Sequence, residues 1–196
     1  MRQVLSGKHG LLALALLGMG GTVQAHTLGL PHMDFATGLG HPLTGLDHVL
    51  VMVAVGLWAA QSGGRALWLV PLTFVLTMAA GGALGFMGIQ LPMVESGIAG
   101  SVWILGILVA LASRLSLAAS TALVGLFAIF HGYAHGAEMA VESSALWFSL
   151  GFMLATAILH GAGIGIALVA RQGMTARLVR AGGVAIAAGG VLLLVG

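Results

Sequence analysis

The feature that most limits what this chain can fold into is a series of long apolar stretches that carry almost no charge. Charged residues make up 6% of the chain and hydrophobic residues 59%, whereas soluble domains carry about 25% charged residues. A helix needs about 20 predominantly apolar residues to cross a bilayer. Stretches of this kind lie at about 43–60, 66–89, 97–112, 117–134, 144–170 and 181–196. The sequence therefore predicts an all-α integral membrane protein, a bundle of six transmembrane helices.

The beginning of the chain has the layout of a secretory signal peptide. A basic start, a short apolar core and a small-residue cleavage site ending at Ala25 follow one another. We expect a cleaved signal peptide at 1–25 and a six-helix transport domain at 26–196, and the alternative is an uncleaved first helix. Intact-mass analysis of the membrane-inserted protein should show His26 as the first residue. Recovery of Met1 would contradict cleavage.

The charges of the mature part indicate one membrane orientation. Its five basic residues balance its five acidic ones, so its charge gives no argument for nucleic-acid binding. All five basic residues fall in loops on one side of the predicted topology: Arg65, Arg114, Arg171, Arg177 and Arg180. The acidic residues fall toward the other side: Asp34, Asp47, Glu95, Glu138 and Glu142. The positive-inside rule then predicts a multi-pass protein of the bacterial inner (cytoplasmic) membrane with both mature termini in the periplasm.

Glycines within the apolar stretches recur at intervals of four residues. Small residues at this spacing let transmembrane helices approach closely. We expect three such pairs to pack helices together: Gly81 and Gly85, Gly132 and Gly136, and Gly161 and Gly165. The sequence contains no phosphate-binding or dinucleotide-binding glycine motif.

Two clusters of ionisable residues border the apolar stretches, where such side chains are costly and usually functional. In the first cluster, Pro42 suits the first turn of a helix, which would place His41 at the cap and His48 nearly two turns along. Asp47 either binds a metal directly or orients an imidazole from behind.

In the second cluster, His131, His135 and Glu138 follow one another at spacings of four and three residues. A continuing helix places all three on one stripe. This spacing favours metal ligation by the two histidines, while Glu138 is equally well interpreted as a solvated acid at a helix end. Both clusters fall near the same predicted membrane face, so we expect His48 to meet His131 or His135 at one shared ion.

Other histidines are weaker candidates. Signal cleavage would leave His26 with a free amine beside its imidazole, which is a chelating pair. His32 and Asp34 follow in the same leading segment, either as a capture site or as a solvated leader. His160 lies deep within the fifth predicted span, where it is either an interhelical hydrogen-bonding residue or a relay on an ion path.

Imidazole and carboxylate donors suit Ni²⁺, Co²⁺, Zn²⁺ and Cu²⁺. The chain has no cysteine, which excludes disulfides and thiolate ligation. The sequence therefore predicts divalent metal binding within a lipid bilayer and is compatible with a homo-oligomer.

These motifs resemble the HupE/UreJ family of small membrane proteins. The first is the segment His41–His48, which reads histidine, five residues, aspartate and histidine, and continues as VLVMVAVGLWAA. The second is FHGYAHGAEM at Phe130–Met139. The resemblance covers the whole chain and implies a cleaved leader, six helices and uptake of nickel or cobalt for hydrogenase or urease maturation. It implies that the functional residues are His41, Asp47, His48, His131, His135 and Glu138.

We therefore expect a nickel permease that is not an enzyme. Two other functions fit the same residues. One is a membrane-embedded zinc hydrolase, in which three protein ligands hold zinc and Glu138 or Asp47 acts as general base. The other is an accessory protein that binds metal without transporting it.

Overall fold

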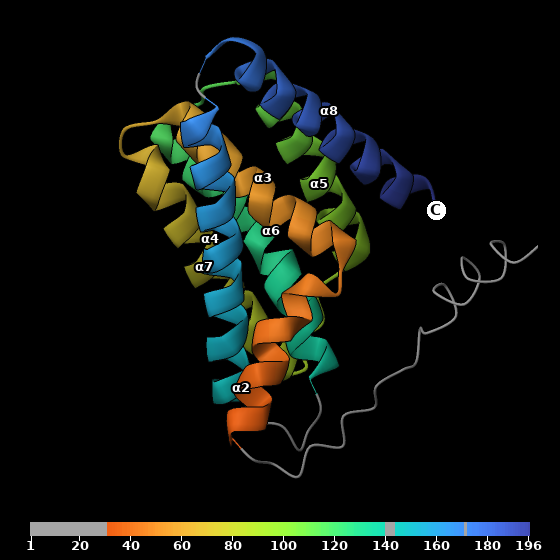
Figure 1. Ribbon diagram of the computed structural model, residues 1–196. Helices are drawn as coiled ribbons and strands as arrows, with labels where there is room; N and C mark the ends of the chain where they lie inside the picture. Colours follow the sequence, from red (N-terminus) through yellow and green to blue (C-terminus); the bar gives the residue numbers. More distant parts are fainter. Residues whose placement is uncertain (1–30, 140–143, 171) are drawn as a thin grey trace, which may run out of the picture.

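The computed structural model describes residues 31–139, 144–170 and 172–196, with side chains from Asp34 onward. The predicted signal peptide and His26 lie outside the described residues. The elements of the described ranges are helical, from α2 (Pro31–Gly40) and the 3-10 turn η1 (His41–Leu43) onward (Figure 1). The long helices follow: α3 (Leu46–Ser62), α4 (Ala66–Phe86), α5 (Val94–Leu111), α6 (Leu117–Glu138), α7 (Ala145–Val169) and α8 (Gly173–Val195).

The lengths and apolar character of these helices confirm a multi-pass, all-helical membrane protein. Within the described ranges, five helices are long and apolar enough to span a bilayer, namely α4 to α8. A sixth span exists if α2 and η1 are counted together with α3 as one broken span, bent by 80°.

The bend corrects the expected course of the first span. We expected a helix beginning at Pro42 with His41 as its cap, but Pro42 lies in η1 and α3 begins only at Leu46. Pro42 has no N–H group, so it cannot continue the hydrogen bonding of α2. Gly45 is extended, with φ −100° and ψ 118°, and it separates the turn from α3.

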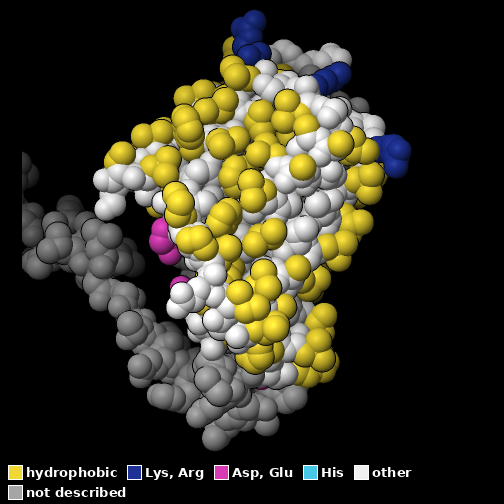
Figure 2. Space-filling view, turned by 180° about the vertical axis from the view of Figure 1, so that it is seen from behind, with side chains coloured by type: hydrophobic (Ala, Val, Ile, Leu, Met, Phe, Trp, Pro, Cys, Tyr) yellow, Lys and Arg dark blue, Asp and Glu magenta, His cyan; other side chains and the backbone are white. Residues whose placement is uncertain are grey.

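The last helix begins earlier than expected. It was predicted at about 181–196, but α8 begins at Gly173, so Arg177 and Arg180 lie on the helix and not in a loop. Long arginine side chains can lie along a helix while their charged heads reach the membrane surface, and Arg180 Nε donates to the Ala110 carbonyl at 2.7 Å. The arginines visible in the space-filling view gather at its upper end (Figure 2), as the positive-inside prediction requires.

Glycines bring α4 and α6 into close contact in the C-terminal part of both helices. A Cβ atom on Gly132 would collide with the Met78 carbonyl oxygen, and one on Gly136 would collide with that of Gly82. From the α4 side, Gly81 and Gly85 approach the α6 backbone in the same way. Two of the predicted glycine pairs therefore face one another, and their lack of side chains lets the backbones touch.

The third glycine pair was predicted wrongly. A Cβ on Gly161 or Gly165 would meet nothing within 4 Å. The glycine of α7 that contacts α3 is Gly163, whose added Cβ would collide with the Val53 carbonyl, and from α3 Gly56 approaches the His160 carbonyl. The spacing of four residues is therefore present on α7, but it lies on a different face from the contact.

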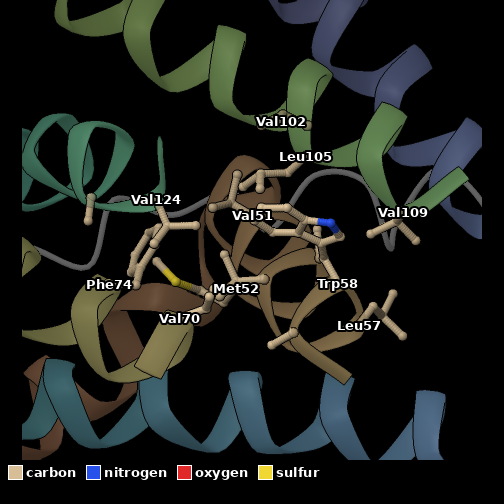
Figure 3. Packing of buried hydrophobic residues seen from close by; sticks show 14 of the residues in the cluster. Val51, Met52, Leu57, Trp58, Val70, Phe74, Val102, Leu105, Val109 and Val124 are labelled. Atoms are coloured by element: carbon tan, nitrogen blue, oxygen red, sulfur yellow. The ribbon is translucent and has the colours of Figure 1, made fainter. Parts of the chain in front are cut away.

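Helix α3 lies at the centre of the bundle. Its Val51, Met52 and Trp58 are fully buried and pack against side chains of neighbouring helices, including Phe74 on α4 and Leu105 on α5 (Figure 3). The outer helices instead expose large apolar side chains, as expected for surfaces that face lipid: Leu72, Leu76, Leu126, Leu154 and Leu192. The first histidine cluster is thus attached to the most enclosed helix of the protein.

Candidate metal centre

The break between η1 and α3 positions the first histidine cluster. His41 lies on η1, whereas Asp47 and His48 lie in the first turn of α3. Gly45 comes so close to these side chains that a Cβ there would lie 2.8 Å from Asp47 Oδ1 and 3.3 Å from His48 Nδ1. The bend therefore turns His41 and His48 toward a common space that a straight helix would not create.

The second cluster reaches this space from α6. His131 is fully buried, and His135 is partly buried one helical turn later. His48 Nε2 lies 3.1 Å from His131 Nδ1 and 2.5 Å from His135 Nε2. His131 and His135, which are more than 80 residues from His48 in sequence, thus both contact the same nitrogen atom of His48.

In His48 and His131, the ring nitrogen that faces away from the shared space is hydrogen-bonded. These hydrogen bonds determine the tautomer of each ring and therefore which nitrogen presents a lone pair to the shared space. His48 Nδ1 lies 3.2 Å from Asp47 Oδ2, and a carboxylate only accepts hydrogen bonds. Nδ1 of His48 therefore carries the proton, and its Nε2 presents a lone pair. Asp47 thus lies behind the His48 ring, in a position to orient the imidazole.

Ser101 determines the tautomer of His131 in the same way. The Ser101 hydroxyl donates to the Ile98 carbonyl at 2.6 Å, so at its 2.7 Å contact with His131 Nε2 the oxygen accepts. Nε2 of His131 then carries the proton, and Nδ1 presents a lone pair toward His48. Two lone pairs 3.1 Å apart in a buried site are unfavourable unless a proton or a metal cation lies between them. Two nitrogens bound to one ion at about 2.0–2.1 Å lie roughly 3 Å apart.

A second group of ligands lies around the outer side of His135. His135 Nδ1 contacts His41 Nε2 at 2.8 Å, and ligand atoms of His41, His135 and Glu138 all lie within 4.8 Å of one another. Glu138 is exposed, whereas the two histidines are partly buried. His135 therefore belongs to both groups, with one ring nitrogen directed toward each.

Aromatic side chains of α7 enclose one side of the histidines. The Phe152 ring lies 4.4 Å from the His135 ring and 6.4 Å from the His48 ring, measured between centroids. Phe148 lies 5.5 Å from His41. A pocket of about 280 Å³ opens beside them between α4, α6 and α7, and its lining includes His135 and Met78.

Sequence reasoning missed Ser101, Phe148 and Phe152. The two phenylalanines offered a weak signal, since they are four residues apart on one face of an apolar helix. Ser101 offered none, because a single serine in a transmembrane helix usually bonds to its own backbone. Ser101 does so here and accepts from His131 in addition.

Two of the remaining candidates, Asp34 and His160, lie away from this site, and the side chain of His32 lies outside the described part of the chain. Asp34 is neither a capture ligand nor a solvated residue, because it is 1% exposed and its Oδ2 accepts from the Ser144 backbone N–H at 2.9 Å. It therefore ties α2 to the start of α7. His26 lies outside the described residues, and His160 is buried further along α7.

Comparisons of the sequence with known proteins give matches over nearly the whole chain. A family model described as "HupE / UreJ protein" matches residues 14–193. Protein HupE of Rhizobium leguminosarum bv. viciae is 47% identical over 184 residues, which cover 93% of this chain and 95% of that protein. No solved structure matches. The match over nearly the whole chain shows that this protein belongs to the HupE/UreJ family.

Proposed function

We propose that this protein is a permease that carries Ni²⁺, or the chemically similar Co²⁺, from the periplasm to the cytoplasm. The ion would supply hydrogenase or urease maturation, with which the family is associated. The observation that carries the proposal is the 3.1 Å approach of His48 Nε2 and His131 Nδ1 in a buried site, where both nitrogens can present a lone pair to one ion. Imidazole ligands favour first-row transition metals over Mg²⁺ and Ca²⁺.

The two ligand groups suggest how an ion enters. Glu138, His41 and the Nδ1 atom of His135 form an outer group that an incoming hydrated ion meets first. Rotation of the His135 ring would carry the ion to its inner side, where His48 and His131 replace further waters. Two adjacent groups with a shared ligand allow stepwise dehydration, and stepwise transfer avoids a single site that binds too tightly for release.

The membrane potential can drive this movement. A potential that is negative inside contributes about 2.3 kcal/mol per elementary charge per 100 mV. A divalent ion gains twice that amount, so inward movement requires no ATP. The predicted orientation places both ligand groups toward the periplasm, at the opposite end of the bundle from Arg65 and Arg114.

Ion flux into proteoliposomes tests the proposal. Purified full-length protein should carry Ni²⁺ and Co²⁺ inward when the lumen is negative, and Mg²⁺ far more slowly. Lipid and amide hydrolysis are assayed on the same preparation. Binding of Ni²⁺ without flux would indicate an accessory metal-binding protein, and metal-dependent hydrolysis would indicate the zinc enzyme; either result contradicts the permease.

Removal of the Ser101 hydroxyl should weaken metal binding without disturbing the fold. Ser101→Ala leaves His131 Nε2 without its acceptor, so the ring can adopt the other tautomer and lose the lone pair that faces His48. Loss of such an orienting group typically costs about 10–100-fold in metal affinity. Equilibrium dialysis with Ni²⁺ measures the change. Unaltered affinity would show that Ser101 does not determine the tautomer of His131.

Asp47→Asn separates the charge of this residue from its shape. The asparagine oxygen can still accept from His48 Nδ1, so the orientation of the ring is retained while the negative charge is lost. We expect uptake at limiting Ni²⁺ to fall about tenfold and Asp47→Leu to lower it further, toward 100-fold. Wild-type uptake in both variants would indicate that Asp47 contributes neither charge nor orientation, whereas an equal loss in both would assign its effect to the charge alone.

A further inference from the structure

Resting on the proposed transport function, we infer that His160, Met78 and Thr156 form a second cation-binding station on the inward side of the histidine centre. This inner station would bind the same class of ion, a divalent first-row transition metal. The ion would reach it after leaving His48 and His131.

The His160 side chain is enclosed but has no polar partner. It is 1% exposed, and among the residues that the structure describes neither of its ring nitrogens has a hydrogen-bond partner. Buried polar atoms are nearly always hydrogen-bonded, since an unmatched one is costly. If His160 served only to fill space, an apolar ring of similar size would fill it at lower cost. A ligand that binds transiently explains both unmatched nitrogens.

The position of His160 continues the path inward from the histidine centre. Phe148, Phe152, Thr156 and His160 are spaced four residues apart along α7, and all four are buried. Their common spacing places them on one face of the helix. The first two line the histidine centre, and a rise of 1.5 Å per residue puts His160 roughly 12 Å beyond Phe152 along the helix axis.

Phe74 lies between the two sites. The centroid of its ring is 5.9 Å from that of His131 and 5.2 Å from that of His160, where the rings meet edge to face at 88°. Phe74 is fully buried on α4. One aromatic side chain therefore separates the inner wall of the histidine centre from the inner station, and rotation of that ring would connect them.

Two further donor atoms lie one helical turn from the level of His160 and Phe74, on the side of the histidine centre. The Thr156 hydroxyl contacts the Met78 sulfur at 3.7 Å, and both side chains are essentially unexposed. Met78 follows Phe74 by one turn of α4, as Thr156 precedes His160 by one turn of α7. Met78 also lines the pocket that His135 borders, so this pocket connects one ligand of the histidine centre with one ligand of the inner station.

The ligand atoms of the inner station can select transition-metal ions and still release them toward the cytoplasm. Imidazole nitrogen and thioether sulfur favour transition metals over Mg²⁺ and Ca²⁺. The three side chains carry no negative charge at neutral pH, in contrast to the histidine centre with Asp47 and Glu138 beside it. A weaker site after a stronger one lets the ion continue toward the cytoplasm.

The test compares His160→Phe and His160→Leu with wild type in the full-length protein. Both variants remove the ring nitrogens while they keep an apolar side chain, and Ser120→Ala serves as the control because it also removes a buried, unmatched polar atom. We measure inward Ni²⁺ flux into proteoliposomes and the number of Ni²⁺ ions bound per chain in equilibrium dialysis. Thermal unfolding in detergent identifies any variant that fails to fold.

We expect at least one folded His160 variant to keep its KM for Ni²⁺ within about twofold while its maximal flux falls at least about tenfold. An unchanged maximal flux would overturn the inner station and leave the permease proposal standing. If wild type carries no Ni²⁺ at all, the permease proposal fails, and the number of bound ions decides the inference. One ion fewer in the His160 variants than in wild type supports the inner station, and an equal number overturns it.

Discussion

Replacing His48 or His131 with alanine is expected to lower Ni²⁺ uptake at limiting concentration at least about 100-fold, more than the loss of an orienting residue. Each substitution removes one of the two lone pairs that face one another at 3.1 Å. His48→Ala removes in addition the nitrogen that His135 contacts. The remaining imidazoles cannot replace enough of the hydration shell of the ion, so the ion does not enter the bundle. Alanine at His41 or His135 should also lower uptake, since both residues belong to the outer group.

The comparison requires that the variants still fold and insert. Both rings are buried polar groups outside the apolar cluster around α3, and we expect expression in the membrane to stay near that of wild type. Ser120→Ala is the matched control, because Ser120 is a buried residue of the same helix as His131 that lies three turns away from it. Wild-type uptake in both the His48 and the His131 variants would eliminate a shared site.

Gly132→Ala is expected to cause the largest loss of stability among glycine-to-alanine substitutions in the described part of the chain. The new Cβ would collide with the Met78 carbonyl oxygen and would lie 2.9 Å from the Gly82 backbone nitrogen. Backbone atoms cannot rotate away as a side chain can, so α4 and α6 must separate along their shared face. Overpacking of this kind costs about 1–3 kcal/mol or more. Thermal unfolding in detergent measures the effect.

Gly161→Ala provides the control for this prediction. It makes the same chemical change in a transmembrane helix, but a Cβ at Gly161 would meet nothing within 4 Å. We expect its stability to stay within about 0.5 kcal/mol of wild type, as for substitutions at exposed positions. Equal destabilisation by the two substitutions would show that close contact between helix backbones does not explain the role of Gly132.

The sequence by itself determined the membrane-spanning architecture and the residues available for a metal site. Long uncharged apolar stretches have few structural solutions, because a bilayer requires backbone groups to be hydrogen-bonded within each segment. The few ionisable residues near them were conspicuous for the same reason. His41, Asp47, His48, His131 and His135 could therefore be selected before the structure was known, as could the two glycine pairs that join α4 to α6.

The tertiary structure alone decided how these residues meet. The bend at Gly45, the contact of Ser101 with His131 and the packing of α7 through Gly163 in place of Gly161 depend on how helices are rotated against one another. A pattern of four-residue spacings shows which residues share a helix face, but it does not show which face meets which neighbour. In a bilayer, lipid gives no hydrophobic preference among apolar faces. The rotation of each helix is therefore set by close packing, which involves residues from distant parts of the chain.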